Sequence, residues 1–294
     1  QRIATLTEQI SYMAYKDPLE ELLIMQCALT ALRLDVLVNN PKLTTIDLTR
    51  NRIRQLFPIT TPPKNKLSVT FLSLAANQLE RLDMSMFAFM PDLERFDVRG
   101  NRIVRFEATS PFDTRNLTFS ELRSIYLDDN ALTELPTHWG KLPKLIYLGF
   151  DRNYLKRVDM SFFGKFPTLT AIFICENNVE SIRTSTPITM PELDIMLFES
   201  NQIVSVNFTG CNFPKMNLIS FMNNRLTTIP PLFQRFPESR LTMEGNPIKC
   251  SSMTALKSRI VDFRLRVTTG STQSDCPTTS SIVLDQDQLA CCDA

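Results

Sequence analysis

The sequence predicts an α/β solenoid. In this fold class about ten repeats stack into a horseshoe, with a parallel sheet along its concave face and, here, a disulfide-stapled helical cap at the C-terminal end. Three observations predict it: an apolar pattern that recurs along the chain, an asparagine at one fixed position of that pattern, and a group of cysteines that begins at Cys250. The 294 residues, 43% of them apolar, are enough to build such a stack.

The recurring pattern is L-x-x-L-x-L-x-x-N/C-x-L, the leucine-rich repeat, in which one unit has about 20 to 29 residues. One copy consists of Leu43, Ile46, Leu48, Asn51 and Ile53. Side chains two positions apart lie on the same face of a strand, so Ile46 and Leu48 both point into a core. The strands of successive repeats are then expected to pair in parallel and to bury a continuous apolar ladder.

An asparagine occupies the same position in nearly every copy. The backbone turns inward there and its peptide groups lose contact with water, and a buried amide can both donate and accept hydrogen bonds. We therefore expect a column of asparagines that satisfies these groups from one repeat to the next. Cys27 replaces asparagine in the first copy and is expected to be a buried free thiol. The column comprises Asn51, Asn77, Asn101, Asn130, Asn153, Asn177, Asn201, Asn224 and Asn246.

The chain is predicted to divide into a solenoid, residues 1–248, and a cysteine-containing cap, residues 249–294. An open solenoid needs caps because it exposes its core at both ends. Met253, Leu256, Ile260 and Phe263 recur at helical spacing and predict one apolar stripe laid over the last strand. At the other end, residues 3–7 are candidates for a capping strand or a partial repeat.

The cap holds four cysteines, a cluster that indicates disulfides and thus an oxidising compartment. A bond between Cys250 and Cys276 would contribute roughly 3–4 kcal/mol; the alternative pairs one of them with Cys291 or Cys292. Adjacent cysteines do not easily bond to each other. If one of the doublet closes the cap, the other is a candidate for a bond between chains. A zinc site competes with disulfides, but no histidine and no C-x-x-C spacing occurs there, so no metal is predicted.

Other features place the chain outside the cell. The triplets that begin at Asn116 and Asn207 are glycosylation acceptors.

A net charge of +1 gives no general attraction to nucleic acid or anionic membranes, and no apolar run is long enough to span a bilayer. Cys175 and Cys211 are expected to be free thiols.

The non-core positions around each strand are expected to form the concave face. Early repeats present a mixed-charge surface of Asp47, Arg50, Arg95, Asp97 and Arg99. Later repeats present Tyr126, Tyr147, Phe173, Ile195, Leu197, Leu218 and Met222. An exposed patch of this kind typically marks a partner-binding site, rich in aromatic hot-spot residues. The alternative is that these side chains pack on each other as a cross-strand ladder.

Nothing in the sequence predicts catalysis or a cofactor. The single histidine, His138, lies in a segment between strands, and no G-x-S-x-G, H-E-x-x-H or phosphate-binding glycine loop occurs. Asp128 and Asp129 precede an asparagine of the column and are interpreted as a solvated edge. The chain is therefore predicted to bind rather than to catalyse.

The order of the C-terminal cysteines points to one family among proteins with this repeat. It runs N-P-x-x-C from Asn246 to Cys250, then a predicted helix, then Cys276, then the Leu-x-Cys-Cys that ends at Cys292. This order resembles that of the leucine-rich immune molecules of mosquitoes, and the repeats and tail together cover the whole chain. Long members of that family continue past the doublet into a coiled coil, whereas this sequence stops two residues after it and is interpreted as a short member or a trimmed chain.

The resemblance implies a secreted binding protein of innate immunity in the haemolymph. Members of that family form disulfide-linked dimers and hold a complement-like thioester protein active. The implied partners are thus such a thioester protein and another leucine-rich immune protein. The alternatives are a structural or adhesion protein, such as a matrix proteoglycan core, and a receptor ectodomain with a different protein ligand.

Overall fold

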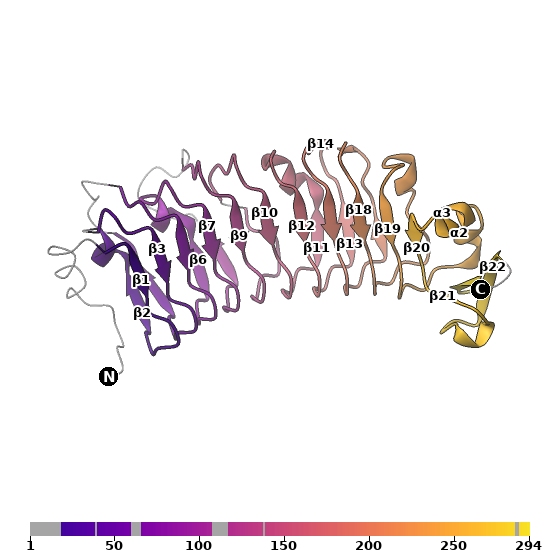
Figure 1. The fold of residues 1–294 in the computed structure, drawn as a ribbon, viewed down its shortest axis with the longest axis horizontal. Helices are drawn as coiled ribbons and strands as arrows, with labels where there is room; N and C mark the ends of the chain where they lie inside the picture. Colours follow the sequence, from indigo (N-terminus) through magenta and orange to yellow (C-terminus); the bar gives the residue numbers. More distant parts are fainter. Residues whose placement is uncertain (1–18, 39, 60–65, 108–116, 138, 286–287) are drawn as a thin grey trace. The chain divides into compact units, whose positions relative to one another are not determined.

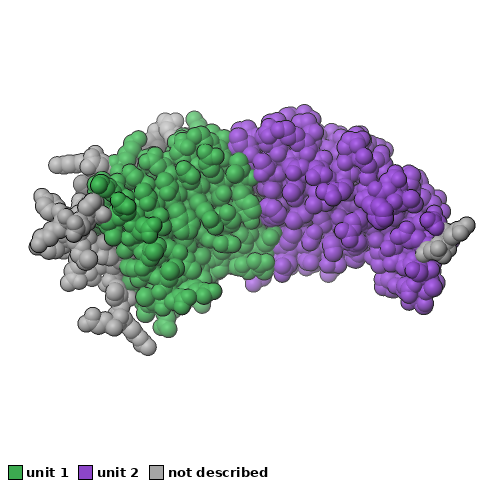
Figure 2. All heavy atoms as spheres, in the orientation of Figure 1, with its two compact units in different colours: residues 1–153 green, residues 154–294 purple. Residues whose placement is uncertain are grey.

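The computed structural model describes residues 19–38, 40–59, 66–107, 117–137, 139–285 and 288–294. Two compact units, residues 1–153 and 154–294, are coloured separately in Figure 2. Both are built from the same short parallel strands, as the repeat pattern predicts (Figure 1). The predicted capping segment 3–7, Asn116 and His138 lie outside the described residues.

In the first unit the main sheet is parallel, and neighbouring strands come from successive repeats. The middle residue of each strand is buried, because side chains on alternate positions point to the same face. The strands, in sheet order, are β1 (Glu21–Leu23), β3 (Thr45–Asp47), β5 (Phe71–Ser73), β7 (Arg95–Asp97), β9 (Ser124–Tyr126) and β10 (Tyr147–Gly149).

Shorter elements complete the repeats of this unit. Later in the repeats that contain β1, β3, β5 and β7, a second set of strands pairs in the same parallel way, and short helices follow some of these strands. The pairs are β2 (Ala31–Arg33) with β4 (Gln55–Phe57) and β6 (Arg81–Asp83) with β8 (Arg105–Glu107); the helices are η1 (Leu34–Leu37) and η2 (Met84–Phe87).

The second unit repeats this arrangement. Its main sheet contains, in order, β12 (Ala171–Phe173), β15 (Ile195–Leu197), β18 (Leu218–Ser220), β19 (Arg240–Thr242) and β20 (Leu265–Arg266). Smaller parallel sheets are β11 (Arg157–Asp159), β13 (Ser181–Arg183) and β16 (Ser205–Val206), and β14 (Ile188–Thr189) with β17 (Cys211–Asn212). The 3-10 helices are η4 (Met160–Lys165) and η5 (Leu232–Gln234).

The asparagine column is confirmed. Asn77 donates from Nδ2 to the carbonyl oxygens of Leu48 and Leu74, both at 3.0 Å, and its Oδ1 accepts the Ile53 N–H at 2.9 Å. In the second unit Asn201 repeats this arrangement with neighbouring repeats. Each amide thus satisfies peptide groups of two repeats, so one side chain stabilises both.

Cys27 departs from the prediction of a buried thiol. It is exposed, and its Sγ donates to the carbonyl oxygen of Met25 at 3.3 Å. β1 is the terminal strand of its sheet, so no earlier repeat of the described chain covers this position. Cys175 and Cys211 are thiols that take part in neither disulfide, as predicted.

The predicted cap helix is divided into two short pieces, α2 (Cys250–Thr254) and α3 (Lys257–Val261). Met253 and Ile260 are buried as the apolar stripe requires. Phe263 is not part of that stripe: its φ is 56° and 72% of its surface is exposed. The chain turns at this left-handed residue into β20, which pairs with β19. β20 thus extends the repeat sheet beyond residue 248. The predicted boundary between the solenoid and the cap, at residues 248/249, stays a prediction.

An antiparallel sheet and two disulfides close the C-terminal end. The strands are β21 (Thr269–Gly270), β22 (Ser280–Asp285) and β23 (Gln288–Cys292), with η6 (Gln273–Asp275) between the first two. The disulfides join Cys250 to Cys292 and Cys276 to Cys291.

The cysteine pairing corrects two expectations. Cys250 and Cys276 are not bonded to each other, so the alternative that uses the doublet is the one observed. Neither Cys291 nor Cys292 remains as a thiol for a bond between chains. The reason is that neighbouring residues of a strand point to opposite faces of the sheet, so each doublet member meets its own partner.

Candidate protein-binding surface

In the first unit the predicted surface residues Tyr126 and Tyr147 lie against each other. They come from the paired strands β9 and β10, and their ring centroids are 4.7 Å apart with a tilt of 35°. Both side chains are half-buried, so the rings pack on each other and still expose part of their surface. The two tyrosines thus pack on each other across the strands, as the alternative interpretation expects, and also leave part of their surface exposed, as a binding surface requires.

Two arginines extend this aromatic pair. The guanidinium carbon of Arg95 lies 5.0 Å from the centroid of the Tyr126 ring, and that of Arg99 lies 4.8 Å from it. Arg99 also donates to the buried carboxylate of Asp97, with Nη2 to Oδ2 at 2.7 Å. This hydrogen bond is the main reason that the pKa of Arg99 is raised. Arg95, Arg99, Tyr126 and Tyr147 thus form a cationic and aromatic platform at β7, β9 and β10.

Asp128 is the residue of this surface that the sequence interpretation missed. Only 5% of it is exposed, and its Oδ1 accepts the Asp151 N–H at 3.0 Å. Gly149 makes room for it, because a Cβ on Gly149 would lie 2.6 Å from Asp128 Oδ1. Burial raises the pKa of Asp128 to about 6, and the nearby Asp151 carboxylate adds to the shift.

The interpretation of Asp128 and Asp129 as a solvated edge is therefore half wrong. Asp129 is exposed and forms an ion pair with Arg152, which lowers its pKa. Asp128, in contrast, is buried beside Gly149. Burial and the charge of Asp128 also raise the pKa of Tyr147. The glycine at position 149, where neighbouring repeats carry a side chain, was the available signal in the sequence.

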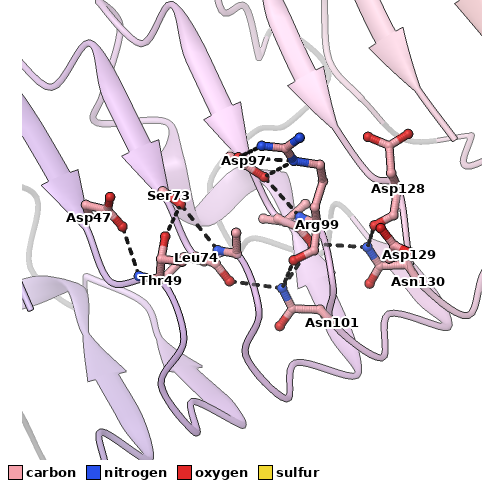
Figure 3. A network of polar contacts seen from close by, with 12 residues as sticks. Asp47, Thr49, Ser73, Leu74, Asp97, Arg99, Asn101, Asp128, Asp129 and Asn130 are labelled. Carbon is pink, nitrogen blue, oxygen red and sulfur yellow. Dashed lines mark hydrogen bonds and ion pairs between the residues drawn. The ribbon is translucent and has the colours of Figure 1, made fainter. Parts of the chain in front are cut away.

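A network of polar contacts connects the early repeats (Figure 3), but Asp97, expected on their exposed mixed-charge surface, is buried. Asp47 Oδ1 accepts the Thr49 N–H at 2.9 Å, and the hydroxyls of Thr49 and Ser73 are 2.8 Å apart. Figure 3 shows Asp97, Arg99 and Asp128 farther along the same row. Arg50 is exposed and lies in the turn before the asparagine column, with φ of 57°.

In the second unit the remaining predicted surface residues lie on neighbouring strands. Phe173 pairs in register with Leu197, and Ile195 with Leu218. Met222 follows β18, and its carbonyl oxygen accepts the Ser200 N–H at 2.8 Å. All five side chains are half-buried. We call Phe173, Ile195, Leu197, Leu218 and Met222 the apolar strip.

Among the described residues no group of three or more histidine, cysteine or acidic side chains is placed to hold a metal ion. No helix in the described part of the chain is long and apolar enough to cross a membrane. The two disulfides fit an extracellular protein.

Comparison with curated proteins finds leucine-rich-repeat relatives. No protein-family model matches the chain. Human mimecan is 30% identical over 193 residues, which cover 64% of this chain and 55% of mimecan. Mouse podocan is 30% identical over 161 residues, or 54% of this chain and 25% of podocan. The chain thus spans about half of mimecan and a smaller share of podocan.

Comparison with solved structures finds the same fold. A chain of the LRIM1/APL1C complex matches with a TM-score of 0.52 and 16% identity, over 100% of this chain and 63% of that one. The APL1 leucine-rich repeat domain matches with a TM-score of 0.52 and 17% identity, over 100% of this chain and 89% of that one. The repeat pattern, the paired strands and the asparagine column agree with these similarities, and the chain has a leucine-rich-repeat fold.

Proposed function

We propose that this chain is a secreted leucine-rich-repeat binding protein of innate immunity, and that it holds a protein partner on the apolar strip. The role is binding, without a catalytic step or cofactor. The observation that carries the proposal is the row of half-buried apolar side chains on β12, β15 and β18. Such a contiguous patch on a rigid sheet is typical of an interaction surface.

The geometry supports tight binding for a physical reason. Neighbouring strands lie about 4.8 Å apart, so the side chains of the apolar strip are held in fixed register. Little side-chain freedom is lost when a partner covers them, because they are already half-buried. A partner that contributes apolar or aromatic side chains would remove their remaining exposed surface from water.

We further propose that the partner is a complement-like thioester protein, and that a second leucine-rich immune protein takes part. The order of the C-terminal cysteines and the structural likeness to chains of the LRIM1/APL1C complex support this choice. Both doublet cysteines are bonded within the chain, so a disulfide-linked dimer would require thiol–disulfide exchange in the cap. The proposed site of action is the haemolymph.

Alanine substitutions test the surface. Phe173→Ala combined with Leu197→Ala should weaken binding of the thioester protein at least about tenfold, which corresponds to a loss of about 1.4 kcal/mol of binding free energy. Tyr147→Ala tests the aromatic platform of the first unit separately. Tyr154→Ala is the matched control, because Tyr154 is 56% exposed and follows the asparagine column. Capture by immobilised protein and the melting temperature are measured together. If the double variant captures the partner as well as the parent protein does, the proposal that the apolar strip is the binding surface is rejected.

A structural or adhesion role is the second candidate, and the identity to mimecan and podocan favours it. A receptor ectodomain with another protein ligand is a further alternative. Pull-down from haemolymph separates the candidates. The immune role predicts recovery of a thioester protein, whereas the structural role predicts recovery of matrix components.

A further inference from the structure

Asn207 lies in the loop between β16 and β17 with its backbone fixed. Its N–H donates to the Ile182 carbonyl oxygen at 2.9 Å, and its own carbonyl oxygen accepts the Thr184 hydroxyl at 3.2 Å. Its side-chain Oδ1 accepts the Thr209 N–H at 2.8 Å. In the described chain Nδ2 has no recorded hydrogen-bond acceptor, and the residue is exposed. The nitrogen that would carry a sugar is therefore the free atom of this side chain.

A groove of about 470 Å³ begins at this residue. Phe208, 3% exposed, anchors the loop between Asn207 and Thr209, so both of these side chains face outward. The rest of the lining is Val206, Pro231, Leu232, Gln234 and Arg235. The lining thus combines apolar side chains, which suit the face of a sugar ring, with amide and guanidinium groups that can bind its acetamido group and hydroxyls.

We propose that Asn207 carries an N-linked glycan and that its first N-acetylglucosamine occupies this groove. A sugar attached to Nδ2 has a high effective concentration in the groove, because Asn207 itself lines it. Arg235 is held in place on the other side, where its Nη1 donates to the Cys211 carbonyl oxygen at 3.0 Å. No recorded hydrogen bond of Asn207 must break to accommodate the sugar.

The attachment is a glycosyl transfer with a polyprenyl-pyrophosphate-linked oligosaccharide as donor. Nδ2 forms a bond to C1 of the reducing-end N-acetylglucosamine, and the bond from C1 to the pyrophosphate oxygen breaks. The polyprenyl pyrophosphate leaves with the bonding pair, and a base of the transferring enzyme takes the amide proton. The step needs passage through a secretory compartment, which the two disulfides fit. It does not depend on the partner captured by the apolar strip.

The position gives the glycan a physical role. β16 and β17, which flank Asn207, are each the last strand of their sheets in the described chain. Edge strands are prone to pair with other chains. A sugar over this loop would obstruct such pairing, so the unglycosylated protein should aggregate more readily.

Site-resolved peptide mapping of the full chain secreted from insect cells tests the attachment. The peptide that contains Asn207 should carry a glycan, and both Asn207→Gln and Thr209→Ala should remove it. Thr209→Ala retains the Asn207 side chain, so it separates loss of the sugar from loss of the asparagine. Asn212→Gln, an exposed asparagine outside any acceptor triplet, should leave the glycan in place. Recovery of folded, secreted protein with unmodified Asn207 overturns the proposal.

Hydrogen exchange tests the position of the first sugar. An endoglycosidase that leaves a single N-acetylglucosamine gives a trimmed protein for comparison with Asn207→Gln. Amides of residues 232–235 should exchange more slowly in the trimmed protein, and Gln234→Ala should reduce that difference. Equal exchange in the trimmed protein and in Asn207→Gln shows that the groove does not hold the sugar.

Discussion

Replacement of Asp128 by asparagine should stabilise the protein at neutral pH. The carboxylate is 5% exposed, and its pKa rises from 3.8 to about 6 on folding. Because the folded-state pKa is the higher one, the favourable contribution of this group is complete below about pH 4 and is lost as the pH rises through about 6. Ionised Asp128 therefore opposes folding at neutral pH.

The size of the effect follows from the shift. About two pKa units at 1.36 kcal/mol each give a penalty of about 3 kcal/mol at pH 7.5. Asparagine keeps an oxygen that can accept the Asp151 N–H and carries no charge. Asp128→Asn should therefore raise the free energy of unfolding by up to about 3 kcal/mol at pH 7.5, and the gain should vanish near pH 4.

Urea denaturation at both pH values measures this directly. Asp129→Asn is the matched control on the adjacent residue. Asp129 is exposed and paired with Arg152, so its replacement should lower stability slightly at pH 7.5, by about 0.2–1 kcal/mol. Equal stability of Asp128→Asn and the parent protein at both pH values would refute the inference that burial raises the pKa of this carboxylate. A loss of stability at pH 7.5 would do so as well.

Other predictions concern the column, the cap and the turn before β20. Asn130→Leu removes an acceptor for the Ile103 N–H and donors to three carbonyl oxygens. It should lower the free energy of unfolding, measured by urea denaturation, by at least about 3 kcal/mol and make the Ile103 amide exchange faster. A loss under about 1 kcal/mol would contradict the stabilising role of the asparagine column. Cys276→Ser with Cys291→Ser opens a disulfide with a sequence separation of 15 and should cost about 3 kcal/mol, and an unchanged melting curve argues against it. Phe263→Gly relieves a left-handed residue that is 72% exposed, so it should add about 1 kcal/mol; destabilisation would mean that the ring packs against the chain.

The repeat fold could be read from the sequence because its signal is local and repeated. Leu72 and Leu74 are buried for the same reason as their counterparts in other repeats, and Asn77 bonds to the peptide groups that the pattern indicates. The inner-face positions of Tyr126 and Tyr147 follow from the same alternation, so their contact was predictable as well. Their use in binding stays a prediction.

The cysteine pairing and the environment of Asp128 depended on contacts between residues far apart in the chain. The sequence left open whether Cys250 pairs with Cys276 or one of them pairs with the doublet. In the structure β23 directs Cys291 and Cys292 to opposite faces of its sheet, and each bonds to a different cysteine. Asp128 is buried because Gly149 in the next repeat leaves space beside it, and a charge pattern alone does not reveal that space. The sequence by itself determined the stack, since periodicity fixes which side chains face the core. Only the tertiary structure decided the disulfide pairing in the cap and the burial of Asp128, because both depend on which residue of a neighbouring strand lies opposite.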